Sequence, residues 1–402
     1  MLITRQLFFI VLILLIDFYF FQRIKSLIGL KKTFRKLYVT NTIFSVLFTL
    51  SIIFLSPEDW NKNLYLIPLA FIFTLTVSKI FACFYFLITD LKTSLFRKNY
   101  AKVSMESRRK FISKIGLGVA AIPFVSLLFG MLKTAFDYEI VKQKISFKNL
   151  PKAFQAFKIL QISDIHAGSF LSAEPLKKAV ELINAQNADL IVFTGDLVNY
   201  KTDEVYPFID VLSQLKAKHG VISILGNHDY GDYMNWKSDA EKNAEKGKMK
   251  TAHAKMGWNL LCNEHLMIEK NEDKIAIIGV ENWSAKGRFK SYGDLKKATE
   301  NLPNEVFKIV LSHDPTHWDA EIIPKFKEID LTLSGHTHGG QIGIFMEKFK
   351  LSPAQIIFEQ WAGLYRNKNQ FLYVNRGLGF VGYNGRLGIK PEITVFSLEI
   401  ES

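Results

Sequence analysis

Aspartate, asparagine and histidine recur in five short blocks, each of which follows a run of apolar residues. The blocks are Asp164-Ile165-His166, Gly195-Asp196-Leu197-Val198-Asn199, Gly226-Asn227-His228-Asp229, Ser312-His313-Asp314 and Gly335-His336-Thr337-His338. Carboxylate oxygen, amide oxygen and imidazole nitrogen suit borderline divalent metals such as Mn, Fe or Zn. A carboxylate shared by two metals about 3.5–4 Å apart is a common basis for hydrolytic sites. The blocks therefore predict a centre for two divalent metal ions, whose identity the sequence does not give.

The apolar runs before these blocks alternate with amphipathic stretches, which predicts an α/β domain. Strands are expected at 157–162, 190–193, 221–225, 275–280, 306–311 and 329–333, and helices at 175–187 and 205–215. Ligands of α/β sheets gather at the carboxyl ends of the strands. We therefore expect the five blocks to converge. The polar segment 230–255 is interpreted as a solvated helix, with a lid or a membrane-facing surface above the site as the alternative.

The order of the blocks resembles that of the calcineurin-like metallophosphoesterases. Their pattern is Asp-x-His, Gly-Asp-x-x-Asn/Asp, Gly-Asn-His-Asp/Glu, a lone His and Gly-His-x-His, and here it extends through residues 140–400. A single short motif would be weak, but five in order are a strong signal. The resemblance implies a double β-sandwich flanked by helices, and hydrolysis of phosphate mono- or diesters.

The resemblance also implies roles for individual residues. Seven metal ligands are expected in two groups that share one bridge: Asp164, His166 and His338 for the first metal, Asn227, His313 and His336 for the second, and Asp196 between them. Water activated by the metals would attack phosphorus. His228 would protonate the leaving oxygen or stabilise its charge, and Asp229 would orient the His228 ring. Asn199 would support the Asp196 loop, or serve only as a turn residue.

The first third of the chain is apolar and predicts a polytopic membrane domain over residues 1–136. Helices are expected near 7–22, 37–55, 64–89 and 115–136, and a bilayer core needs about 20 apolar residues of helix. The alternative is a set of buried helices in a soluble protein. The phosphoesterase domain would then occupy residues 137–402.

Charge is distributed unevenly between these two parts. Residues 1–136 carry 18 Lys/Arg and 5 Asp/Glu, whereas the remainder carries 33 of each. The overall net charge of +13 therefore does not indicate a specific nucleic-acid partner, because the excess is not on the folded domain. Only Cys83 and Cys262 are present, which excludes a disulfide framework or a cysteine-rich zinc site.

The basic residues of the membrane part predict its orientation. Segments 22–36 and 90–114 are strongly basic, whereas the short loop between the second and third apolar runs carries Glu58 and Asp59. Basic loops remain cytoplasmic. The catalytic domain is therefore expected outside the cytoplasm, anchored in a cell (inner) membrane by a multi-pass domain.

Two further features of the membrane part each allow two interpretations. Arg108-Arg109-Lys110 resembles a twin-arginine export signal, which would make the twin-arginine translocase a partner, or it is simply a basic cytoplasmic segment. Asp17 and Lys79 lie within apolar runs. They form an ion pair inside the membrane, or each reaches the interface separately.

The membrane location suggests a substrate that is lipid-linked or otherwise part of the cell envelope, so the lipid bilayer itself is an expected partner. One alternative is a cytoplasmic enzyme resembling the UDP-diacylglucosamine hydrolases of lipid A synthesis. Another is a catalytically inactive sensor or scaffold. Intact residues at every motif position argue against inactivity.

Overall fold

The computed structural model describes residues 2–28, 32–54, 62–95, 104–287, 289–346 and 349–401. The chain forms two compact units, residues 1–129 and 130–402. Each unit is described by itself below. The expected acidic loop with Glu58 and Asp59 lies outside the described residues.

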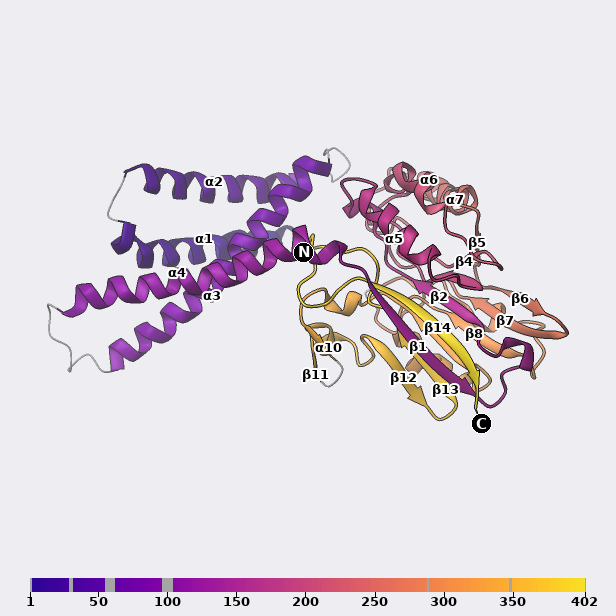
Figure 1. Ribbon diagram of the computed structural model, residues 1–402. Helices are drawn as coiled ribbons and strands as arrows, with labels where there is room; N and C mark the ends of the chain where they lie inside the picture. Colours follow the sequence, from indigo (N-terminus) through magenta and orange to yellow (C-terminus); the bar gives the residue numbers. More distant parts are fainter. Residues whose placement is uncertain are drawn as a thin grey trace. The chain divides into compact units, whose positions relative to one another are not determined.

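The described part of the first unit is helical (Figure 1). The last turn of its fourth helix, from Gly130, belongs to the second unit. Its helices are α1 (Leu2–Ile28), α2 (Lys32–Phe54), α3 (Lys62–Leu95) and α4 (Ser104–Leu132). The segments Leu66–Leu95 and Ser107–Phe136 are long and apolar enough to cross a membrane, by length and composition alone. The fourth helix begins earlier than expected, so Arg108 and Arg109 lie on α4 and not in a loop.

A buried polar cluster joins three of these helices. Lys79 Nζ on α3 lies 2.6 Å from Asp17 Oδ1 on α1, and both side chains are buried. Thr42 on α2 donates its hydroxyl to Asp17 Oδ2 at 2.5 Å. The two charged residues therefore form a pair and do not reach the interface separately. This agrees with the rule that ionisable groups at membrane depth are paired.

The second unit contains two six-stranded sheets. The first has the order β1 (Glu139–Phe147), β14 (Glu392–Ile400), β2 (Lys158–Ile162), β3 (Leu190–Phe193), β4 (Val221–Ser223) and β5 (Trp258–Leu260). The second has the order β12 (Gly363–Asn367), β13 (Gln370–Val374), β9 (Leu331–Ser334), β8 (Phe307–Leu311), β7 (Asp273–Gly279) and β6 (Glu264–Lys270). A separate hairpin consists of β10 (Ile344–Met346) and β11 (Phe349–Leu351).

Apolar side chains from both sheets form one core between them. Ile159 and Val192 of the first sheet belong to the same buried cluster as Ile277 and Leu333 of the second. The outer face of the first sheet packs on α5 (Glu174–Asn184), α6 (Ile209–Leu212) and α7 (Asp239–Lys255). The outer face of the second packs on α8 (Leu295–Ala298) and α9 (Ile323–Lys325), while α10 (Ala354–Ile357) follows the hairpin. The predicted double β-sandwich flanked by helices is thus confirmed.

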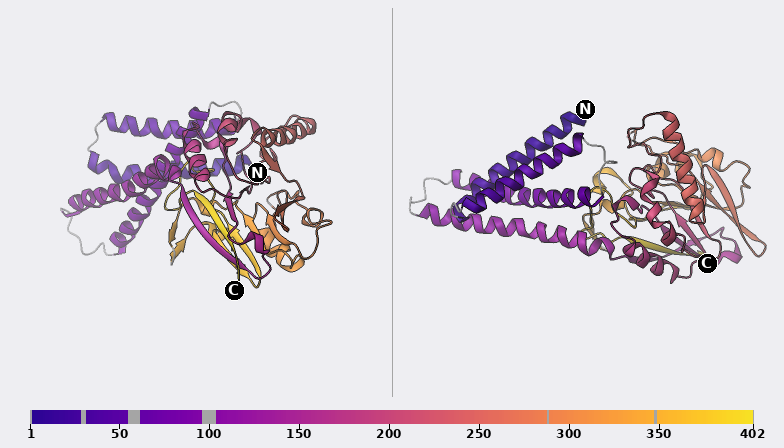
Figure 2. Two further views of the ribbon diagram at one scale, coloured as in Figure 1. Left: turned by 45° about the vertical axis from the view of Figure 1, so that its right-hand side comes forward. Right: turned by 90° about the horizontal axis from the view of Figure 1, so that it is seen from above.

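The two ends of this unit meet in the first sheet. Residues 139–147 of β1 pair in parallel with residues 392–400 of β14, and Figure 2 shows these strands side by side. The expected helix at 205–215 is shorter than predicted. Its start at 206–208 is a 3₁₀ turn containing Pro207, and only 209–212 is α-helical.

Strand direction determines where the site forms. In the first sheet β2, β3 and β4 run parallel, and in the second β7, β8 and β9 run parallel. The carboxyl ends of β2, β3, β4, β8 and β9 lead into the polar blocks of the sequence. Because both sheets contribute such ends, the site is assembled from both.

Candidate metal centre

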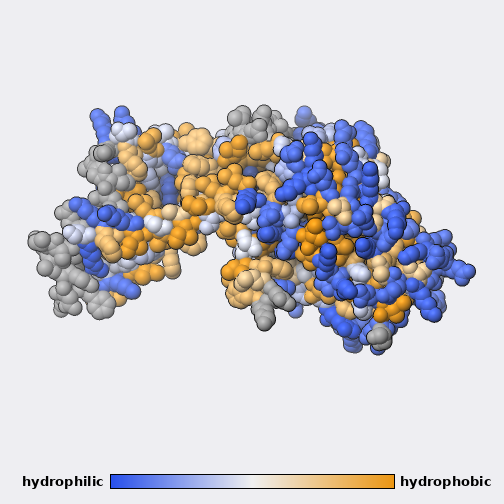
Figure 3. Space-filling view, viewed as in Figure 1, coloured by the Kyte–Doolittle hydropathy of each residue, from blue (hydrophilic) through white to orange (hydrophobic). Residues whose placement is uncertain are grey.

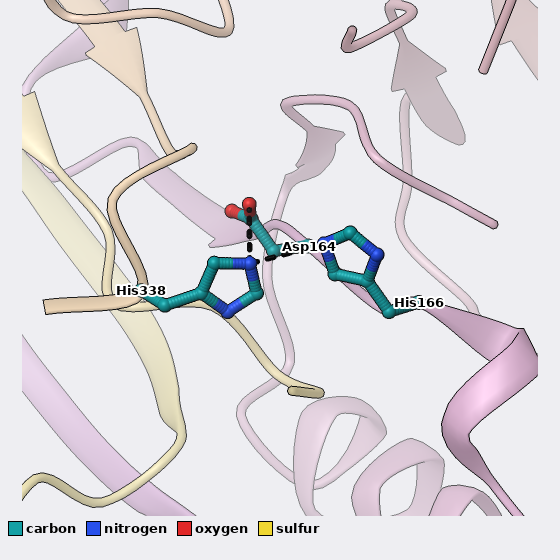
Figure 4. Close-up of side chains that lie close together, drawn as sticks. All are labelled: Asp164, His166 and His338. Carbon is teal, nitrogen blue, oxygen red and sulfur yellow. Dashed lines mark hydrogen bonds and ion pairs between the residues drawn. The ribbon is translucent and has the colours of Figure 1, made fainter. Parts of the chain in front are cut away.

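The first group of candidate ligands comes from both sheets. Asp164 and His166 follow β2, and His338 follows β9. One ligand atom from each lies within 4.8 Å of the others, and all three side chains are buried. The His166 and His338 Nε2 atoms are 3.0 Å apart, and His338 Nε2 is 3.3 Å from Asp164 Oδ1 (Figure 4).

The second group is built in the same way. Asp196 follows β3, His313 follows β8 and His336 follows β9. Their ligand atoms also lie within 4.8 Å of one another. His313 Nε2 is 3.0 Å from Asp196 Oδ2 and 3.2 Å from His336 Nδ1.

One carboxylate lies between the two groups. Asp196 Oδ2 is 3.5 Å from His166 Nε2 of the first group and 3.0 Å from His313 Nε2 of the second. Burial alone would raise the pKa of Asp196, but the neighbouring His313 and His228 hold it well below its usual range. The side chain is therefore anionic, as a shared ligand must be.

The imidazole groups are held mostly in the neutral form. Burial lowers the pKa of His166 to about 3 and that of His336 to about 4. Burial also lowers the pKa of His338 well below its usual range. Neutral imidazole is the form that binds metals. His313 differs because Asp196 outweighs the effect of burial and raises the pKa to about 10.

The backbone at the ligands adopts an unusual conformation. Five of the candidate ligands have positive φ: Asp164, His166, Asp196, His336 and His338. Such conformations cost about 1–3 kcal/mol each for residues other than glycine and cluster at functional sites. Gly195, which precedes Asp196, has a φ of 95°, and a Cβ at this position would lie 2.5 Å from the Gly226 backbone nitrogen. Glycine is therefore required where these two loops meet.

The donor set fits divalent cations. His166 and His338 direct ring nitrogens at each other, as do His313 and His336. His166 Nδ1 faces the acceptor oxygen Asn199 Oδ1 at 2.9 Å and so carries the proton of the neutral ring, which leaves a lone pair on His166 Nε2. Asn227 Oδ1 is buried and has no hydrogen-bond partner among the described residues. Buried polar atoms are normally satisfied, and a cation near these lone pairs would satisfy them.

Comparison with known proteins agrees with this geometry. Residues 2–135 match a family described as "Probable Calcineurin-like phosphoesterase, transmembrane domain", and residues 157–340 match "Calcineurin-like phosphoesterase". The Bacillus subtilis protein "Uncharacterized metallophosphoesterase YkuE" is 32% identical over 267 residues, which are 65% of this chain and 85% of that protein. The chain belongs to the calcineurin-like phosphoesterases. It is accordingly a metal-dependent hydrolase of phosphate esters.

Other relatives of this phosphoesterase differ in how much of the chain they share. A Campylobacter jejuni protein, "Uncharacterized metallophosphoesterase Cj0846", is 28% identical over 397 residues and 97% of both chains. The zebrafish "Transmembrane protein with metallophosphoesterase domain" is 29% identical over 68% of this chain, which spans 60% of that protein's length. A solved dimetal phosphatase from zebrafish superposes with a TM-score of 0.34 at 10% identity, covering 61% of this chain and 93% of that one.

The structure corrects the expected role of Asp229. Its carboxylate accepts hydrogen bonds from the backbone nitrogens of Asp196, Leu197, Val198 and Gly226, at 2.8 to 3.2 Å. It therefore fixes the loop that carries Asp196. The His228 ring instead places Nδ1 2.7 Å from the carbonyl oxygen of Asn199. The prediction that Asp229 orients this ring was wrong because neighbours in sequence need not face each other in a tight turn.

Two other residues support the ligands. Asn199 Oδ1 lies 2.9 Å from His166 Nδ1, so the supporting role left open for Asn199 applies to a histidine ligand and not only to the loop. Asp314, which the sequence reasoning did not assign, places Oδ2 3.7 Å from His336 Nε2. At this distance the carboxylate makes no hydrogen bond to the ring, so its effect on His336 is electrostatic. The sequence signal that could have identified Asp314 is its position directly after the candidate ligand His313.

The histidines outside the motifs have other partners. His253 Nδ1 lies 2.9 Å from Ser223 Oγ, and His265 Nδ1 lies 2.8 Å from the Ala298 carbonyl. His317 contacts Ser312 and Glu321. Each of these three histidines thus has a polar partner outside the ligand groups, although His253 Nε2 is buried without a partner among the described residues.

Proposed function

We propose that this phosphoesterase hydrolyses mono- or diesters of phosphate in a lipid-linked or envelope substrate, using two divalent ions such as Mn, Fe or Zn. The observation that carries the proposal is the position of Asp196 Oδ2, within 3.5 Å of a histidine nitrogen in each ligand group. When bound, the two ions supply Lewis acidity and a water of lowered pKa.

His228 is the residue best placed to handle a proton. The Asn199 carbonyl can only accept, so His228 Nδ1 carries hydrogen and donates at 2.7 Å. This leaves Nε2 to hold or release a proton toward the substrate. The ring lies 4.9 Å from that of His166, centroid to centroid, and is only partly buried. It therefore borders the ligands and remains reachable.

The proposed setting is a multi-pass anchor of four membrane spans with the catalytic unit outside the cytoplasm. Support comes from the transmembrane family match over residues 2–135 and from the 18 basic and 5 acidic residues before residue 137. The proposal includes export by the twin-arginine translocase, because Arg108-Arg109 resembles its signal.

Activity can be tested with the purified full chain. We expect turnover of bis(p-nitrophenyl) phosphate after loading with Mn, Fe or Zn, loss of turnover with a chelator, and recovery when the metal is returned. Each active chain should bind two ions. A fully metal-loaded chain without turnover on either mono- or diesters would overturn the proposed hydrolysis.

Topology is tested separately by fusing a reporter after residue 402. A reporter that is active only outside the cytoplasm should be active. Activity of a cytoplasm-only reporter would instead favour the hydrolase of lipid A synthesis type. Changing Arg108 and Arg109 to Lys should block export if the translocase is used, and unchanged export would remove the translocase from the proposal.

A further inference from the structure

The β10–β11 hairpin and α10 expose a group of large apolar side chains. We call this group the apolar hairpin: Ile344, Met346, Phe349, Leu351, Ile356 and Ile357. Their exposed fractions run from 43% to 89%. Figure 3 shows apolar side chains gathered over these elements. Soluble proteins rarely expose contiguous apolar patches of this kind unless the patch binds something.

The register of the hairpin concentrates these side chains on one face. Ile344 is opposite Leu351, and Met346 is opposite Phe349. Side chains alternate between the faces of a strand, so these four share one face. Phe345 lies on the other face and packs against Trp361 with ring centroids 5.7 Å apart. A hairpin in contact with water on one side would normally be polar there.

The base of the hairpin lies close to the point where α4 enters the catalytic unit. The last turn of α4 belongs to this unit, and the Gly130 carbonyl accepts a hydrogen bond from the Arg386 nitrogen at 3.1 Å. The next residue, Leu387, exchanges backbone hydrogen bonds with Gln341 and Gly343 at 2.8 and 2.9 Å. Gly343 directly precedes β10. Backbone hydrogen bonds of Arg386 and Leu387 thus connect the end of a candidate membrane span to the base of the apolar hairpin.

Two lysines lie beside the apolar hairpin: Lys350 is on its opposite face with Phe345, and Lys286 donates to the Ile357 carbonyl at the end of α10. Lys350 Nζ lies 4.6 Å from the centre of the Phe345 ring, and Lys286 Nζ lies 4.5 Å from that of Phe358. Lysine next to exposed apolar and aromatic residues is typical of segments that lie in a membrane interface. The positive charge also suits anionic headgroups.

We propose that the apolar hairpin is inserted into the interface of the bilayer that holds the anchor helices. Phe358 follows the hairpin group directly and contacts His336, with ring centroids 5.4 Å apart. Insertion would therefore bring the His336 edge of the metal centre to the lipid surface. Insertion of the hairpin into the bilayer does not depend on the proposed hydrolysis. Only its advantage for reaching a lipid-linked substrate rests on the proposed function.

Spin labels can report the depth of the hairpin without measuring catalysis. The full chain, with Cys83→Ala and Cys262→Ser, would be labelled at Phe349→Cys or Ile356→Cys. The control is Ile400→Cys, since Ile400 is also an exposed apolar residue, at the far end of β14. The chain is reconstituted in vesicles of phosphatidylethanolamine and phosphatidylglycerol. Collision of each label with oxygen and with a water-soluble nickel chelate is then measured.

We expect labels at 349 and 356 to collide mainly with oxygen, and the label at 400 to collide mainly with nickel. Met346→Ser with Phe349→Ser should raise nickel access at 356, whereas Met346→Leu with Phe349→Leu should not. Bound metal per chain verifies that each variant is folded. Nickel access at 349 and 356 equal to that at 400 would overturn the proposal. Shielding from both reagents would also overturn it, because protein would then cover the hairpin.

Discussion

Buried charged residues occur in both units of this phosphoesterase, and the two clusters are built differently. In the membrane unit, Lys79 neutralises Asp17, whose second oxygen accepts from Thr42. In the catalytic unit, ring nitrogens of His166 and His338 face each other, and Asn227 Oδ1 has no partner among the described residues. The first cluster is complete by itself, whereas the second leaves the Asn227 oxygen without a donor among the described residues. This difference distinguishes a structural ion pair from a cation-binding site.

The largest effect is expected from removing the shared carboxylate. Asp196→Asn should lower turnover of bis(p-nitrophenyl) phosphate by about 10⁴-fold, because several kcal/mol of stabilisation by both ions is lost. Metal analysis should show weaker binding of both ions. The matched variant Asp164→Asn should weaken chiefly one. Two tightly held ions in Asp196→Asn would contradict the bridging role.

A change at His228 should affect the chemical step and not the metals. His228→Ala should keep two ions but lose about two to four orders of magnitude in rate on an alkyl phosphate ester. The loss on a nitrophenyl ester should be much smaller, because that leaving group needs no proton. Equal losses on the two esters would leave His228 as a phosphate-binding group, and loss of one ion would make it a ligand.

Breaking the membrane pair should affect stability and not metal binding. Asp17→Ala leaves Lys79 buried without its partner and should destabilise the first unit by about 3–5 kcal/mol. Thermal unfolding in detergent measures this. The double variant Asp17→Leu with Lys79→Leu should recover most of the loss, since a buried pair is often replaceable by apolar residues. A single variant as stable as the parent would show that the pair is not structural.

The smallest effects are expected from the supporting residues of the metal centre. Asn199→Ala should weaken metal binding at the His166 group by about 10–100-fold. Asp314→Asn should weaken it less at the His336 group, because its carboxylate lies beyond hydrogen-bond distance of the ring. Metal titrations that resolve the two ions would check this. If both variants weakened the same ion, the division into two groups would be wrong.

The sequence alone predicted much of the site because its parts are local. Each block follows its strand directly, so the strands and the ligand types could be identified together. Predicted strands such as 190–193 and 306–311 agree with β3 and β8 within a residue. The strands β1, β5, β6 and β10 to β14 were not predicted. The pairing of β1 with β14 could not be, because it joins distant segments, as in Glu139 with Glu392.

Tertiary structure decided which ligands share a metal and which residues support them. His338 lies beside His166 although 172 residues separate them, because β9 and β2 belong to two sheets that share one core. The turn after β4 directs Asp229 to the backbone of the Asp196 loop. Chain direction at such turns depends on positive φ angles and close loop contacts. Residue types and spacing determine the chemistry available, whereas packing between distant segments determines which atoms meet.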